Sequence, residues 1–99
     1  MKSIILIVTF ELNDQNLLED WKQMSAGITA QLQSVDGFIS RDSAVDEAGK
    51  IYCVVKWESM EQQKEFRKIL ESPAFEENMK AFAKIANMET MEEKFIEVI

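Results

Sequence analysis

The sequence lacks histidine and contains a single cysteine, Cys53. One cysteine cannot form a disulfide within the chain, which excludes a secreted scaffold held together by disulfides. A nucleophilic cysteine needs a basic neighbour that stabilises its thiolate, and the chain offers no histidine for that role. Because Cys53 stands in an apolar, strand-like segment, the sequence predicts a packed and buried thiol.

Basic residues are scarce as well. Eleven lysines and arginines stand against eighteen aspartates and glutamates, which gives a formal net charge of −7. Such a chain repels phosphate backbones and anionic membrane surfaces, so neither nucleic acid nor a membrane is an expected partner. The apolar run Ile4–Val8 is shorter than the core of a signal peptide and is soon followed by Glu11, which predicts a strand in a cytoplasmic protein.

Motifs of common enzyme chemistry are missing too. The sequence has no glycine-rich phosphate loop, no metal-ligand spacing and no nucleophile–base pair, so it predicts no metal site. The pairs Glu76-Glu77 and Glu92-Glu93 are adjacent in sequence and do not share a helix face, which argues against an acid–base dyad. The sequence therefore marks out no catalytic residue.

What is present is typical of one globular domain. The 99 residues are 46% hydrophobic and 29% charged, a composition that supports a packed core. Two cores would leave each half of the chain too small to offset its conformational entropy. Residues 1–99 are therefore predicted to form a single domain.

The first strand and helix are predicted by their periodicity. Ile4–Leu12 alternates, but both of its faces begin apolar, which predicts helices on one face and another surface, such as a partner subunit, on the other. Asn13 and Asp14 suit a helix N-terminus, and the apolar spacing beyond them predicts an amphipathic helix of about five turns. Gly27 within that helix favours close approach of a neighbouring backbone.

A hairpin follows. Gly37 precedes a strand over Phe38–Val45, and a loop with Gly49 leads into the most β-prone segment, Ile51–Trp57. The first of these two strands alternates unevenly, with the polar residues Arg41, Asp42 and Ser43 scattered through it. This unevenness predicts that one of its sides meets water or a sheet edge.

The second half of the chain is predicted to form further helices followed by a last strand. Ser59 and Gln62 have capping-box spacing and predict a helix after them, and a further helical region is predicted over Pro73–Asn87. The polar segment Met88–Lys94 is predicted to be turn-like, and Phe95–Ile99 to be the fourth strand. The order β-α-β-β-α-β predicts an α+β, ferredoxin-like fold with a four-stranded antiparallel sheet.

Three segments resemble one known family. They are Val35-Asp36-Gly37-Phe38, the run from Tyr52 to Lys56 with Trp57-Glu58-Ser59 after it, and Ser72-Pro73-Ala74-Phe75. In type and order they resemble the antibiotic-biosynthesis monooxygenases. This resemblance implies a homodimer in which two sheets pack face to face into a dimeric α+β barrel. It also implies a cavity for a small aromatic ligand between the sheet and the helices of each subunit.

Haem-degrading proteins of this family use an asparagine in the first strand, a tryptophan in the helix after the third strand, and an iron-ligating histidine in the last helix. At those places this chain has Phe10 or Glu11, Phe66 and Met79. Because the usual iron ligand is missing, the resemblance points away from haem degradation. It points instead to members that work without any cofactor.

The candidate cavity-lining residues are Trp57, Phe66, Phe75, Met79, Phe82, Tyr52 and Asn78. Aromatic and methionine side chains at helical spacing are equally what a packed core uses, so a structural role is the alternative for each. Tyr52 and Asn78 could offer hydrogen bonds to a carbonyl or a phenol.

Two functions of different classes fit the sequence. One is a cofactor-independent monooxygenase that acts on a quinol-like or polycyclic aromatic substrate; its base would be a carboxylate, Tyr52 or a lysine. The other is a non-catalytic dimeric protein of the same fold that binds small molecules or serves in stress responses.

Overall fold

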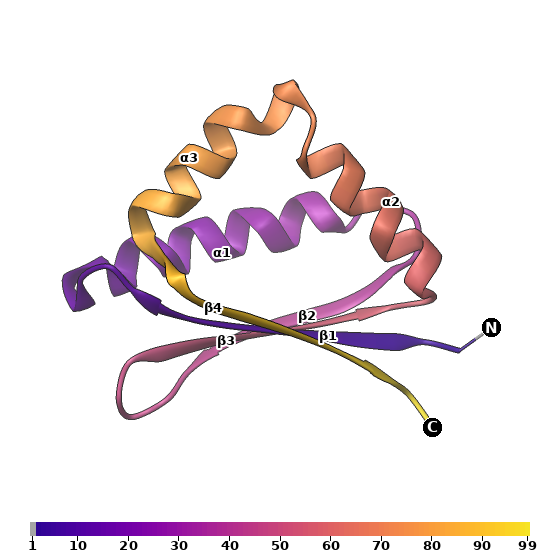
Figure 1. The fold of residues 1–99 in the computed structure, drawn as a ribbon, viewed down its shortest axis with the longest axis horizontal. Coiled ribbons are helices and arrows are strands. Elements are labelled where there is room, and N and C mark those ends of the chain that lie inside the picture. The colour runs from indigo at the N-terminus through magenta and orange to yellow at the C-terminus, as the bar shows by residue number, and fades with distance from the viewer. Residues whose placement is uncertain (1) are drawn as a thin grey trace.

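The computed structural model describes residues 2–99 as one antiparallel sheet with its helices on one face (Figure 1). The elements are β1 (Ile4–Leu12), α1 (Leu18–Leu32), β2 (Phe38–Val45), β3 (Lys50–Trp57), α2 (Met60–Leu70), α3 (Glu76–Ile85) and β4 (Ala86–Glu97). The strand order is β2-β3-β1-β4. The predicted α+β, ferredoxin-like fold is therefore confirmed. Within residues 2–99, no helix is both long and apolar enough to cross a bilayer.

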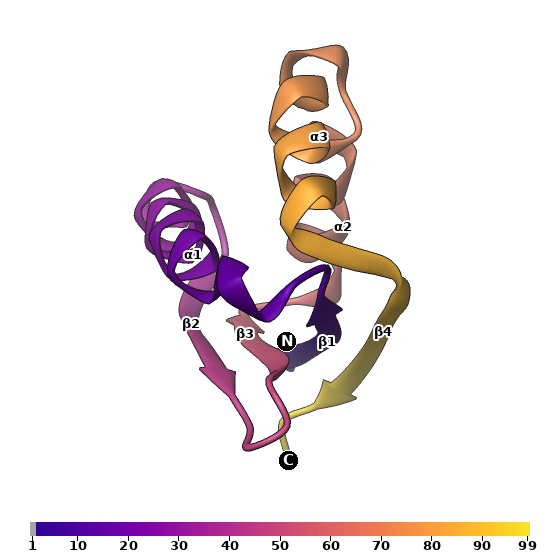
Figure 2. The same cartoon turned by 90° about the vertical axis from the view of Figure 1, so that its left-hand side faces the viewer.

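The central strand β1 is apolar on both faces, as predicted. It pairs antiparallel with β3 on one side and β4 on the other. Ile4, Leu6 and Phe10 are buried beneath the helices. Ile5 and Ile7 face the opposite side, where Figure 2 shows no helix among the described residues.

The helices are held at two places by aromatic clusters. At one end the Phe10 ring meets Trp21 edge-on at 5.0 Å between centroids and Phe82 at 5.5 Å. At the other end Trp57 contacts Phe38 at 6.0 Å and Phe66 at 5.4 Å. The Trp57 and Phe66 rings are tilted by 36°, whereas the other pairs meet edge to face. Edge-to-face aromatic pairs stabilise by about 0.5–1.5 kcal/mol beyond the burial of their area.

The predicted turns and caps are confirmed. Gly37 and Gly49 have φ of +86° and +90°, a region that side chains with a Cβ rarely adopt. A Cβ at Gly37 would also lie 2.5 Å from the side chain of Gln62. Ser59 accepts a hydrogen bond from the Gln62 backbone N–H and so caps α2.

The prediction for Gly27 was wrong. No atom of a neighbouring element lies within 4 Å of the position where its Cβ would be. The glycine therefore brings no backbone closer to α1.

The last helix and strand differ from the prediction. The helix ends at Ile85 instead of Asn87, and the segment predicted as a turn, Met88–Lys94, belongs to the 12-residue strand β4. The polar composition of this segment reflects its place at a sheet edge, where charged side chains are common.

The end of α3 is capped from outside the helix. The Asn13 side-chain amide donates to the carbonyls of Ala83 at 3.0 Å, Lys84 at 2.9 Å and Ala86 at 3.3 Å. These carbonyls have no partner within the helix. Asp14, in contrast, fills the predicted capping role by accepting from the Asn16 N–H at the turn before α1.

We expect Asn13→Ala to lower the free energy of unfolding by about 1–2 kcal/mol, because it leaves the last carbonyls of α3 without this donor. In a domain of this size each kcal/mol corresponds to about 4–8 °C in Tm, which thermal unfolding followed by circular dichroism would detect. The control is Asn78→Ala, since Asn78 is exposed on α3. Equal melting temperatures for the two variants would contradict the capping role.

Candidate functional site

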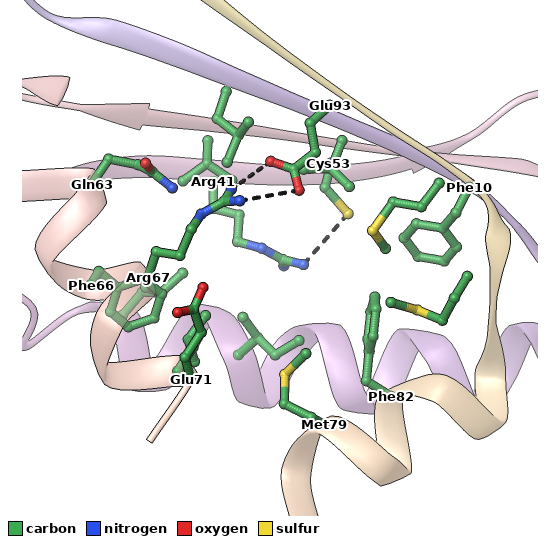
Figure 3. Close-up of a pocket in the computed structure, with 18 of the residues that line it drawn as sticks. Phe10, Arg41, Cys53, Gln63, Phe66, Arg67, Glu71, Met79, Phe82 and Glu93 are labelled. Atoms are coloured by element: carbon green, nitrogen blue, oxygen red, sulfur yellow. Dashed lines mark hydrogen bonds and ion pairs between the residues drawn. The ribbon is translucent and has the colours of Figure 1, made fainter. Parts of the chain in front are cut away.

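A cavity of about 710 Å³ lies between the sheet and the three helices (Figure 3). Its walls are formed mainly by the apolar side chains Leu6, Val8, Phe10, Trp21, Ile28, Leu32, Val55, Trp57, Phe66, Leu70, Met79, Phe82, Met88 and Met91. The volume falls within the range of pockets that hold drug-sized ligands. The interior of this fold is therefore open.

Four of the seven candidate residues line this cavity: Trp57, Phe66, Met79 and Phe82. The sequence allowed Trp57 either a place in the core or one in the cavity wall, and it has both. Its side chain is only 1% exposed, and it also lines the cavity. Their contact with a ligand remains a prediction.

The other three candidates lie elsewhere. Tyr52 pairs with Thr9 on the helix-free face of the sheet, and its hydroxyl donates to Asp46 at 3.1 Å. Phe75 is partly buried in the short turn before α3, and Asn78 is exposed on that helix. None of the three is among the residues that line the cavity.

The polar residue that matters most in this cavity was not among the candidates. A β-bulge between Phe38 and Ser40 inserts one extra residue into β2 opposite β3. Because side chains alternate along a strand, the extra residue exchanges the two faces of everything that follows. Arg41 then lies opposite Val55 and points under the helices instead of into solvent.

The Arg41 guanidinium ties α1 to the sheet. Its Nη1 donates to the Ser25 hydroxyl at 2.7 Å, the Ser25 carbonyl at 3.2 Å and the Thr29 hydroxyl at 3.0 Å. Its Nη2 approaches Cys53 Sγ at 3.6 Å, the contact drawn as a dashed line in Figure 3. All of these acceptors are neutral.

A second arginine in the cavity is paired with a carboxylate. Arg67 on α2 donates to Glu93 on β4 through Nη1 at 3.4 Å and Nη2 at 2.5 Å. Glu76, at the cavity rim, forms an ion pair in which its Oε1 lies 3.7 Å from Lys80 Nζ. Glu71, also in the lining, has no ion-pair partner among residues 2–99.

Two buried polar atoms in the cavity lining lack a hydrogen-bond partner in the described protein: Gln63 Oε1 and Trp57 Nε1. Gln63 is 4% exposed. A buried donor or acceptor without a partner costs about 1–3 kcal/mol. One acceptor and one donor are thus left for a ligand or for water.

The spacing of the polar residues on α2 and at its C-cap, Glu71, could have indicated that they line the cavity. Gln63, Arg67 and Glu71 recur every four residues and so share a helix face with Phe66 and Leu70. Among the residues of that face, only an apolar one, Phe66, was predicted to line the cavity.

Cys53 is buried, as predicted. Its burial raises the pKa of the thiol, and this effect outweighs the opposing charge of Arg41 and the hydrogen bonds from Ser43 and Arg41. The thiol is therefore protonated at neutral pH. Among residues 2–99 there is also no group of three or more metal-binding side chains placed around a common point.

Solved structures share this architecture along the whole chain. SnoaB from Streptomyces nogalater, a cofactor-independent oxygenase, matches with a TM-score of 0.76 and 14% identity over 100% of this chain and 95% of its own. The chain has the same protomer fold as SnoaB. The predicted resemblance to the antibiotic-biosynthesis monooxygenases is thus confirmed at the level of the fold.

Two further structures agree with the SnoaB fold. A Nitrosomonas europaea protein with the provisional description antibiotic biosynthesis monooxygenase has a TM-score of 0.78 at 10% identity, covering 98% of this chain and 90% of its own. Rv0793 from Mycobacterium tuberculosis has a TM-score of 0.75 at 12% identity, covering 98% and 95%. No protein-family model and no curated protein sequence matches the chain.

We expect Cys53 in the folded protein to react with iodoacetamide at pH 8 at least about tenfold more slowly than in the chain unfolded in guanidinium, because the buried thiol stays protonated. Mass spectrometry of timed samples would measure the two rates, with free N-acetylcysteine as the reference for both solutions. A folded-state rate equal to the unfolded one would mean that the thiol is accessible and ionised, contrary to the burial described above.

Proposed function

We propose that the protein is a cofactor-independent monooxygenase that acts on a quinol-like or polycyclic aromatic substrate. The observation that carries the proposal is the open, largely apolar cavity of about 710 Å³ with aromatic clusters at both ends. Trp57 and Phe66 at one end, and Phe82 at the other, offer ring faces and edges to a flat ligand. The fold that the chain shares with SnoaB, a cofactor-independent oxygenase, also supports this proposal.

The chemistry needs no external reductant. For an anthrone-like substrate, a ring CH₂ becomes C=O, one oxygen atom of O₂ enters the product, and the other leaves as water with the two hydrogens. The substrate itself supplies the four electrons. Removal of a proton first gives an electron-rich anion that can reduce O₂, so the protein must supply a base and stabilise an anion.

Glu71 is the base that we propose. Its carboxylate points into the cavity in Figure 3, and it is the lining carboxylate without an ion-pair partner among residues 2–99. Glu93 is paired with Arg67 and Glu76 with Lys80, so each of these two carboxylates already has a cationic partner. Glu71 is also exposed, so a proton that it accepts can pass to water.

The test is oxygen consumption by the protein with anthrone or menadiol under air. We expect a rate above the uncatalysed background for at least one of them, and a loss of about 10²-fold or more in Glu71→Gln, which is the range for removal of a general base. The matched control is Glu76→Gln, a lining carboxylate on the same rim that should leave the rate unchanged.

If no such substrate is consumed above background, the oxygenase proposal is wrong. Binding of these aromatic molecules without turnover would then favour the alternative, a non-catalytic small-molecule-binding protein with the same cavity. Equal losses in Glu71→Gln and Glu76→Gln would remove Glu71 from the role of base while leaving the oxygenase reaction in place.

We further propose that the protein is a homodimer formed through the helix-free face of the sheet. That face carries Ile5, Ile7, Val54 and Ile96 at its centre, and Val54 and Ile96 are each 37% exposed in the single chain. Apolar side chains grouped on one exposed face are typical of an interface. Two such sheets pack at about 10 Å from each other.

We expect light scattering to give a mass near twice the 11.4 kDa of one chain. Val54→Lys should yield monomers, because the dimer would have to bury an added charge at a cost of several kcal/mol. The control is Ile69→Lys, which adds the same charge at a 50% exposed position on α2. A wild-type mass near 11.4 kDa, or a dimeric Val54→Lys, would refute this interface.

A further inference from the structure

We propose that the ligand of this cavity presents an anionic oxygen, from a carboxylate or an ionised phenol or enol, to Arg41. The inference rests on the proposed function in taking this cavity as the substrate site, and it specifies the charge of the substrate. It applies to a binding protein with the same cavity as well.

The first argument is the missing counter-ion. No carboxylate within residues 2–99 lies at ion-pair distance from the Arg41 guanidinium. The chain has eighteen acidic residues and a net charge of −7, so carboxylates are abundant elsewhere. A cation that is partly withdrawn from water favours an anion beside it.

The second argument is the orientation of the guanidinium. Its Nη1 is occupied by the neutral oxygens of Ser25 and Thr29, which fix the group in place. Its Nη2 has only the weak sulfur acceptor of Cys53, and its Nε–H has no acceptor among the described residues. Nε and Nη2 form one edge of the planar fork that binds carboxylates in a bidentate manner.

The third argument is the contrast with the other arginine of the cavity. Arg67 is neutralised by Glu93, whose carboxylate accepts from both Nη1 and Nη2 of the guanidinium. Arg41 and Glu71 both line the cavity, yet they do not pair with each other. The cavity therefore keeps one cation and one carboxylate apart, each available to a bound molecule.

The neighbouring buried groups are compatible with an oxygen-bearing ligand. Trp57 Nε1 is a donor, and Gln63 Oε1 an acceptor, without a partner in the described protein. Both residues belong to the same cavity lining as Arg41. A flat aromatic molecule with an anionic oxygen at Arg41 and a further hydroxyl or carbonyl group could use all three.

The experiment compares anthraquinone-2-carboxylate with its neutral carboxamide. Trp21 and Trp57 are the only tryptophans of the chain and both line the cavity, so quenching of their fluorescence reports binding. These probes are already quinones, so binding is measured without turnover. We expect the carboxylate to bind at least about tenfold more tightly, as a charge-assisted pair would give.

Variants assign the preference to Arg41. Arg41→Gln should abolish it, whereas Arg41→Lys should keep part of it because the charge remains without the planar fork. The matched control is the double variant Arg67→Gln/Glu93→Gln, which removes a neutral ion pair from the same cavity and should keep the full preference. Circular dichroism establishes that each variant is folded.

A second arm distinguishes a permanent carboxylate from an oxygen that ionises. The absorbance of 2-hydroxyanthraquinone is followed against pH with and without protein. A lowered phenol pKa in the wild type, lost in Arg41→Gln, identifies an ionising oxygen as the group that Arg41 recognises. A carboxylate preference without this shift identifies a carboxylate.

Equal binding of the carboxylate and the carboxamide by the wild type, together with an unmoved phenol pKa, overturns the proposal even if no variant folds. A preference that survives in Arg41→Gln overturns it as well. Failure of oxygen consumption in the earlier test leaves these binding results unaffected, so the two proposals can fail separately.

Discussion

The constraint on which this structure depends is that β1 is apolar on both faces while the helices cover only one of them. The central position of β1 follows from its pairing with β3 and β4. On the covered face, Leu6 and Phe10 bury against α1, α2 and α3. On the other face, no helix within residues 2–99 covers Ile5 and Ile7. One strand thus defines both the floor of the cavity and the surface available to a second copy.

The cavity stays open because aromatic side chains hold the helices away from the sheet at both ends of the cavity. The cluster of Phe10, Trp21 and Phe82 fills one end, and the cluster around Trp57 fills the other. The only residues that pack against both clusters are Val8 and Ile28, two partly buried aliphatic residues. In Figure 1, α2 and α3 rise from the sheet as an arch, with the break between them at Ser72-Pro73. The large aromatic rings at the two ends set the distance between the helices and the sheet. The smaller aliphatic side chains between the clusters do not fill the space that results.

The fold could be predicted from the sequence largely because local signals agreed with it. Alternation, the cap at Ser59 and the positive-φ glycines predicted the helices and the strands β1, β2 and β3 within a few residues of their bounds, whereas β4 begins at Ala86 instead of Phe95. The site was less accessible. The bulge at Phe38–Ser40 reverses which side chains of β2 face the helices. Because polar and apolar residues do not alternate regularly in β2, the sequence gives no sign of this extra residue. Arg41 therefore looked like an edge residue, and β4 looked like a turn because its edge position permits polar side chains.

Arg41 also links folding to recognition. It contacts Ser25 and Thr29 on α1 and Cys53 on β3, so it helps to hold α1 against the sheet. It lines the main cavity and a smaller one of about 300 Å³ between α1 and β2. Neutral oxygens can solvate a guanidinium, but they do not cancel its charge. The packing that fixes α1 thus leaves a positive charge at the wall of an apolar cavity, and this charge, more than the shape of the cavity, would separate an anionic aromatic ligand from a neutral one.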